Sequence, residues 1–298
     1  MSMHKLLKLN ARRALRGRWG PAAAVTLMVL AIGFLFNLFE GVLNITLGVA
    51  PFDDVMMTPN NLFDDLANTS ALALSVAFAT AALAFVIMTP LGLGVQRWFY
   101  RLGEGVSDEI STVFEFFGAS RLFWKSLLLC CSVWVRSALW SVLFLLPGSL
   151  VIFFSVMVAG RSGTNRESFA AAGGILVGCL LLALGMLFAI IWCSRYYLAR
   201  YYLMENVRLS VRQAVGKSIA STKESRCSIF LFELSFFGWY LLCLLVFPYL
   251  FVYPYHMTAR GLYARYLMTA AEQPPPAGSG FPEGAGLPEQ AQHESWSE

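Results

Sequence analysis

Charged side chains are scarce in this sequence. Asp, Glu, Lys and Arg make up 13% of the 298 residues, whereas a soluble domain carries about 25% charge. Hydrophobic residues make up 57%. A soluble core of this length cannot bury so much apolar surface, but helices that cross a bilayer leave apolar side chains facing lipid. We therefore expect an all-α polytopic transmembrane bundle.

Groups that bind metals or carry catalysis are also few. The three histidines, His4, His256 and His293, lie in three separate parts of the chain. The cysteines fall within or at the ends of apolar runs, at the spacing of neither a zinc site nor a disulfide framework. They are Cys130, Cys131, Cys179, Cys193, Cys227 and Cys243. The sequence predicts no metal site, no cofactor and no catalytic residue.

Runs that contain at most one charge mark the expected spans. Each of these runs is long enough to cross a bilayer with some tilt. The first four are predicted near residues 21–47, 70–93, 126–157 and 169–193.

The apolar region 227–268 has two interpretations. It is either one long helix or a hairpin of two spans, 227–246 and 249–268, with its turn near Pro248, which removes a backbone donor. The hairpin keeps the basic residues at both ends of the region on one side of the membrane. We expect about six spans, or five if the region is a single helix.

The distribution of basic residues predicts the orientation. Six Lys and Arg residues precede the first span without an acid, and the loop that follows that span carries acids but no base. Positive residues collect on the cytoplasmic side, so we expect the N-terminus, and with the hairpin also the C-terminus, in the cytoplasm. The expected location is the cell membrane.

Three segments lie outside the spans. Residues 1–20 form a basic amphipathic segment that fits either a helix on an anionic leaflet or a simple topogenic charge. Residues 206–225 predict a second basic amphipathic helix, which has no aromatic side chains for stacking on nucleic-acid bases. The tail 269–298 is acidic and rich in Pro and Gly, and we expect it to be disordered. The transmembrane domain is then 21–268. The expected partners are the anionic inner leaflet and a second copy or another membrane protein, and nucleic acid is not expected.

Two charges lie inside predicted spans, Arg136 and Glu233. An ionised group in hydrocarbon costs at least about 2.5 kcal/mol and needs a partner, water or a proton. The two residues could form a structural pair or a proton or ligand site, or they could snorkel to the interface.

Proline and glycine predict positions where helices could break. These positions are Pro90, Pro147, Gly148, Pro248 and Pro254. Broken helices line cavities in transporters, but Pro and Gly are also ordinary packing residues in membrane helices.

Several short motifs together resemble one family. In chain order they are LWSVLFLLPG at 139–148, RLSVRQAVGKSIAS at 208–221, LSFFGW at 234–239 and VYPY at 252–255. They resemble the bacterial integral-membrane family catalogued as domain of unknown function family 975, and ARRALRGRW at 11–19 is similar to the start of that family. The chain departs from the family by an extra apolar hairpin after Gly148 and by Glu233 where aspartate is common. The resemblance implies a multi-pass membrane protein without an assigned activity.

These patterns favour a non-catalytic interaction, lipid-binding or membrane-organising role. The alternative is a small-solute transporter that uses Glu233 and Arg136. An enzyme would need polar groups that converge near one leaflet. The tyrosines of 195–205, with Arg195 and Arg200, are the one such cluster in the sequence, and they also fit an interfacial aromatic belt.

Overall fold

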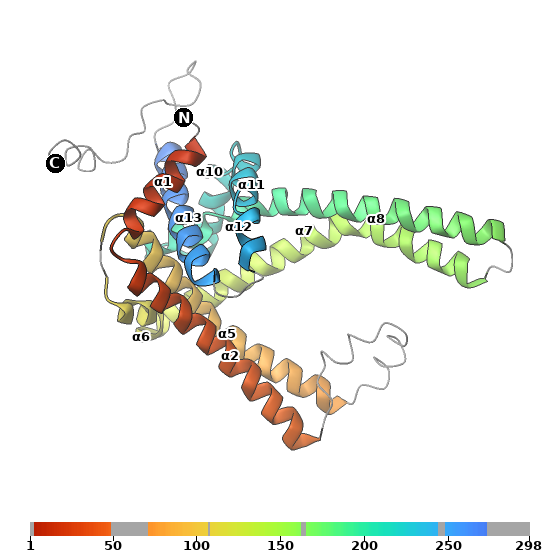
Figure 1. Cartoon of the computed structure of the whole chain (residues 1–298), viewed down its shortest axis with the longest axis horizontal. Coiled ribbons are helices and arrows are strands. Elements are labelled where there is room, and N and C mark those ends of the chain that lie inside the picture. The colour runs from red at the N-terminus through yellow and green to blue at the C-terminus, as the bar shows by residue number, and fades with distance from the viewer. Residues whose placement is uncertain (1–2, 49–70, 107, 162–164, 244–247, 273–298) are drawn as a thin grey trace, which may run out of the picture. The chain divides into compact units, whose positions relative to one another are not determined.

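A computed structural model describes residues 3–48, 71–106, 108–161, 165–243 and 248–272, and within these ranges all regular structure is helical (Figure 1). The acidic loop after the first span, residues 244–247 just before Pro248 at the expected turn of the 227–268 hairpin, and residues 273–298 of the predicted tail 269–298 lie outside the described residues.

The chain folds into two compact units. Unit 1 comprises residues 1–132 and 236–259, and unit 2 comprises residues 133–235 and 260–298. The helices wholly within unit 1 are α1 (Met3–Leu15), α2 (Trp19–Leu47), α5 (Ala71–Gly103), η1 (Ile110–Phe114), α6 (Glu115–Gly118) and α12 (Phe237–Leu242). Those wholly within unit 2 are α8 (Asn165–Cys193), η2 (Ser194–Tyr196), α9 (Ala199–Glu205), α10 (Val211–Ser221) and α11 (Arg226–Leu234). Two helices, α7 (Ser120–Arg161) and α13 (Tyr249–Glu272), contribute residues to both units.

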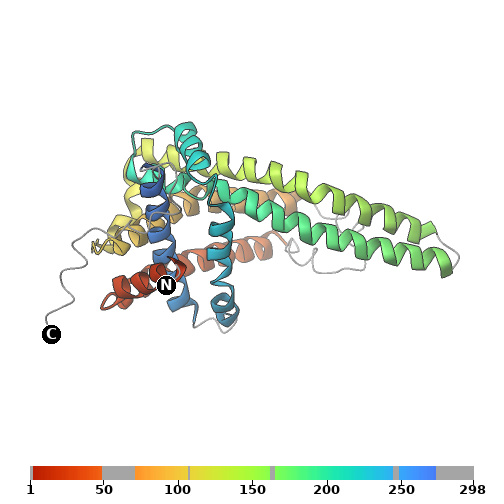
Figure 2. The ribbon, with the colours of Figure 1, turned by 90° about the horizontal axis from the view of Figure 1, so that it is seen from above.

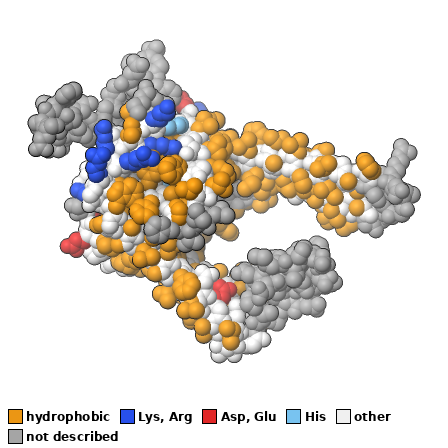
Figure 3. Space-filling model, in the orientation of Figure 1, with side chains coloured by type: hydrophobic (Ala, Val, Ile, Leu, Met, Phe, Trp, Pro, Cys, Tyr) orange, Lys and Arg blue, Asp and Glu red, His pale blue; other side chains and the backbone are white. Residues whose placement is uncertain are grey.

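Among the described residues, four helical segments are long and apolar enough to cross a membrane. They are Trp19–Leu47, Leu74–Gly103, Ser120–Ala159 and Ala171–Glu205. Between 11% and 28% of their most apolar windows is buried within the protein, so most of their apolar side chains face outward, as lipid-facing surface does. Figure 3 shows hydrophobic side chains along these helices. The first four predicted spans therefore correspond to long apolar helices.

The region predicted as a fifth and sixth span is built differently. It forms α11, α12 and α13, none of which is among the helices long and apolar enough to cross. A single helix over 227–268 is not formed, because α11 ends at Leu234 and α12 begins at Phe237. Spans 227–246 and 249–268 remain a proposal.

Prolines lie inside three of the long helices without ending them. α5 continues through Pro90, α7 through Pro147 and the adjacent Gly148, and α13 through Pro254. A proline removes one helical hydrogen bond, and membrane helices tolerate that loss when neighbouring groups satisfy the freed carbonyl. Pro248 lies directly before α13, and its carbonyl accepts hydrogen bonds from the amides of Phe251 and Val252. It therefore belongs to the start of that helix.

Unit 1 is built around α5. Both α1 and α2 pack against this helix, and η1 crosses it closely at Gly94, where a Cβ would collide with the carbonyl oxygen of Val113. From α1, the residues in this core are Leu7, Ala11 and Leu15. The N-terminal helix is therefore a packed part of unit 1.

In unit 2, α7 and α8 run side by side as a hairpin (Figures 1 and 2). Glycines hold the two backbones close together. A Cβ on Gly148 would lie 2.7 Å from the backbone nitrogen of Leu182, and a Cβ on Gly185 would collide with the carbonyl oxygen of Phe144. Small residues at such spacing let membrane helices approach without a hydrophobic driving force.

The short helices of unit 2 have strong local signals. α10 begins with a capping box, in which the Ser210 hydroxyl accepts from the Gln213 amide and the Gln213 side chain accepts from the Ser210 amide. Two hydroxyls of this region, those of Ser218 and Thr222, donate to the backbone carbonyl of Arg195, which follows α8. These bonds fix the end of α8 against the segment 218–222.

Candidate functional site

The first candidate site is the ion pair of Glu233 in unit 2. The Oε1 atom of Glu233, near the end of α11, lies 2.9 Å from Nε of Arg260 on α13. The two side chains are 31% and 29% exposed, respectively. The guanidinium of Arg260 also lies over the ring of Tyr197, 5.3 Å from its centroid, and the Tyr197 hydroxyl donates to the Arg260 carbonyl at 3.0 Å. Glu233 is therefore part of a half-buried structural cluster.

The two charges singled out from the sequence are not brought together. Glu233 pairs with Arg260, and within the described residues Arg136 of α7 has no ion pair. Arg260 is one of the basic residues at the end of the 227–268 region that were expected to set its orientation. The signal for its role was its position inside the predicted span 249–268, where a charge needs a partner as much as Glu233 does.

The second candidate site is the outer face of α1 in unit 1. Because Leu7, Ala11 and Leu15 point into the core, the opposite face of the helix is exposed. This exposed face carries Lys5, Leu6, Leu9, Arg12 and Arg13, and the exposed Arg16 directly follows the helix. Leu6, next to Leu7 in the chain, is 42% exposed, so the leucines of α1 do not all lie on its buried face.

Two basic residues of α1 contact aromatic rings of unit 1. The Lys8 ammonium lies 4.4 Å from the centroid of Phe236, and the Arg12 guanidinium lies 5.3 Å from that of Tyr255. Burial lowers the pKa of Lys8, and the neighbouring Arg12 guanidinium lowers it further. Each contact of this kind contributes about 0.5 to 1 kcal/mol at an exposed site. In Figure 3, Lys and Arg side chains gather over α1.

A family model described as "Protein of unknown function (DUF975)" matches residues 1–271. The chain belongs to the DUF975 family. No curated protein and no solved structure matches it. The family assignment agrees with the resemblance of the sequence motifs, and it covers both units. The family has no assigned activity.

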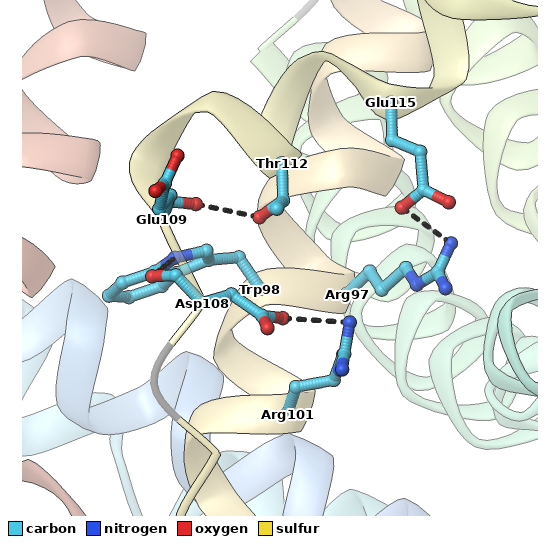
Figure 4. Close-up of polar contacts among 7 residues, drawn as sticks. All are labelled: Arg97, Trp98, Arg101, Asp108, Glu109, Thr112 and Glu115. Atoms are coloured by element: carbon cyan, nitrogen blue, oxygen red, sulfur yellow. Dashed lines mark hydrogen bonds and ion pairs between the residues drawn. The ribbon is translucent and has the colours of Figure 1, made fainter.

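The connection that follows α5 is a third polar cluster of this DUF975 protein (Figure 4). Arg97 and Arg101, one turn apart on α5, pair with Glu115 at 2.8 Å and with Asp108 at 3.0 Å. The indole N–H of Trp98 donates to the Asp108 carbonyl at 3.2 Å. The two arginines and their two acidic partners therefore tie the connection to α5.

The described residues offer no metal centre. Among them, no group of three or more His, Cys, Asp and Glu side chains could hold an ion. The six cysteines are free thiols. The tyrosines after α8 contribute to packing, with Tyr197 against both Tyr201 and Tyr263.

Proposed function

We propose that this DUF975 chain is a non-catalytic multi-pass protein of the cell membrane, whose helix α1 binds anionic lipid headgroups at the cytoplasmic surface. The supporting observation is the orientation of α1. Its apolar face is buried in unit 1, whereas the side chains of Lys5, Arg13 and Arg16 are exposed and can meet a charged surface.

The charges and their neighbours suit a membrane surface. Lys5, Arg13 and Arg16 are exposed, and basic residues near an anionic leaflet contribute about 1 kcal/mol each. Leu6 and Leu9, on the same face, are 42% and 40% exposed and would reach the acyl boundary. Because α2 begins at Trp19, directly after α1, a span holds this face close to the bilayer.

The expected side of the membrane for α1 is the same whether the chain has four spans or six. With four spans or with six, the number is even, so both ends of the chain lie on the same side. The basic residues before α2 place that side in the cytoplasm. The basic face of α1 then meets the inner leaflet, where anionic lipids attract it.

The transport alternative has less support. It depended on an intramembrane site made of Glu233 and Arg136, and Glu233 has a different basic partner in Arg260. A satisfied ion pair is a packing element as readily as a transport site. We therefore propose the lipid-binding role alone.

The test compares lipid retention by the purified chain. The protein is reconstituted in nanodiscs of mixed phosphatidylglycerol and phosphatidylcholine. It is then released from the nanodiscs in the mass spectrometer, and native mass spectrometry counts the lipids of each kind that remain bound to it. The wild type is expected to enrich phosphatidylglycerol, and the triple substitution Lys5→Gln, Arg13→Gln, Arg16→Gln to lose most of that enrichment. Raising the salt concentration should weaken the enrichment, because exposed charges are screened.

A charge-preserving variant is the matched control. Lys5→Arg, Arg13→Lys, Arg16→Lys keeps the charge and the helix, so it should retain phosphatidylglycerol as the wild type does. If the glutamine variant enriches phosphatidylglycerol as strongly as this control, α1 is not the lipid-binding element.

A further inference from the structure

Two arginines of unit 2 lie against the same indole ring. The guanidinium carbon of Arg195, just after α8, is 5.4 Å from the centroid of Trp192, and that of Arg226, the first residue of α11, is 4.8 Å from it. Arg195 also lies 5.7 Å from the ring of Trp140 on α7. We call Trp140, Trp192, Arg195 and Arg226 the indole–arginine cluster.

This cluster has buried donors without acceptors. Within the described residues, nothing accepts a hydrogen bond from the Nε–H of Arg195, the Nε–H of Arg226 or the indole N–H of Trp192, and all three nitrogens are buried. Among the described residues, neither Arg195 nor Arg226 forms an ion pair. Buried donors in proteins almost always have partners.

The polar groups around the cluster do not fill this need. The carbonyl of Arg195 is occupied by hydroxyl donors from Ser218 and Thr222. The nearby carboxylate of Glu233, also on α11, pairs with Arg260. The cluster therefore has positive charge and unbonded donors, and neither of these two groups supplies an acceptor for them.

The start of α11 adds a second anion-attracting element. Arg226 is the first residue of this nine-residue helix, and Ser225 at its N-cap makes no side-chain capping bond. The first amides of a helix have no intrahelical acceptor, and they carry the positive end of the helix dipole. A helix start beside two guanidinium groups is a favourable environment for a phosphate.

We propose that the indole–arginine cluster binds a phosphate group. Guanidinium groups match phosphate oxygens with paired hydrogen bonds, and the unbonded Trp192 N–H can add a neutral donor. The ring centroids of Trp140 and Trp192 lie 5.2 Å apart. Tryptophan is enriched in membrane proteins at the depth of the lipid headgroups. The phosphate comes from a phospholipid headgroup of the inner leaflet or from a soluble phosphate ester. This inference does not rest on the role proposed for α1, which belongs to unit 1.

The experiment measures how a phosphate source shifts thermal unfolding of the full chain. Purified protein in a neutral detergent is titrated in one arm with phosphatidylglycerol and in the other with inorganic phosphate, each against sodium chloride of equal ionic strength. A saturable rise of the midpoint in the first arm alone assigns a lipid phosphate, and a rise in the second arm assigns a soluble one. No saturable rise in either arm overturns the proposal.

Substitutions place the effect at the cluster. Arg226→Gln should weaken the apparent affinity for the phosphate source by about tenfold or more, because one charge-assisted contact is lost. Arg226→Lys keeps the charge and remains usable if the glutamine variant does not fold, and it should weaken binding because lysine lacks the planar fork. Arg200→Gln is the matched control, because Arg200 is exposed on α9 in the same segment. If the Arg226 variants bind as Arg200→Gln does, the phosphate lies elsewhere. The α1 glutamine variant should retain the response, which separates this site from the proposed function.

Discussion

Replacing Gly148 by alanine is expected to force α7 and α8 apart. The new Cβ would lie 2.7 Å from the backbone nitrogen of Leu182 and 3.0 Å from the carbonyl oxygen of Gly178. Carbon contacts are optimal at about 3.5 to 4.0 Å, so the helices must separate by nearly 1 Å at this point. Both contacted atoms belong to the backbone, so no rotamer change relieves the collision. Overpacking of this kind costs about 1 to 3 kcal/mol.

The assay is thermal unfolding in detergent micelles, followed by tryptophan fluorescence. Trp140 and Trp192 lie on α7 and α8 with ring centroids 5.2 Å apart, so they report on the separation of the hairpin. Each kcal/mol lost lowers the midpoint by about 2 to 4 °C for a chain of this size class. Gly148→Ala should therefore unfold several degrees below the wild type.

Gly173 on α8 is the matched control. A Cβ there meets nothing within 4 Å, and the residue is exposed. Gly173→Ala should leave the midpoint unchanged or raise it slightly, because alanine is the better helix former. If Gly148→Ala and Gly173→Ala unfold at the same temperature, the close approach of the two backbones does not hold the hairpin together, and the reasoning is refuted.

Three further outcomes are expected. Ser210→Ala removes the capping box shared with Gln213, so α10 should lose about 1 kcal/mol, seen as faster amide exchange in α10 alone; unchanged exchange would contradict the role of the cap. Glu233→Gln leaves the half-buried charge of Arg260 unmatched and should lower the free energy of unfolding by about 1 to 2 kcal/mol, less than for a fully buried pair. The double variant Glu233→Gln, Arg260→Gln should lose less unfolding free energy than the sum of the two single variants. Additive costs would show that the pair is not coupled. Burial, aided by a neighbouring lysine, lowers the pKa of His4, so folding stability should fall as the pH drops below about 6.5, the unfolded value, and His4→Gln should flatten that dependence.

The long helices could be predicted because their signal is local. A charge-free apolar run is visible in the sequence itself, and the prediction for 21–47 falls within two residues of α2, Trp19–Leu47. The 227–268 region was harder, because α11 and α12 are separate short helices in a run that is apolar almost throughout. Composition alone does not locate such an interruption.

The partners of charged residues could not be predicted in the same way. Glu233 and Arg260 are adjacent only because α11 and α13 fold together, and the sequence offered Arg136 at a similar expected depth. The rotation of α1 was also hidden, since Leu6 and Leu7 are neighbours in the chain but only Leu7 enters the core. In both cases the deciding contact comes from residues distant in sequence.

The glycine contacts between α7 and α8 have a consequence for how the protein is made. Every close approach in this hairpin joins residues of two consecutive helices, so the pair can form as soon as α8 has left the ribosome. α8 begins at Asn165, soon after α7 ends at Arg161, so bringing these two consecutive helices together carries little entropic cost. The hairpin can therefore enter the bilayer as a finished unit during translation, before α10, α11 and α13 exist to hold its base.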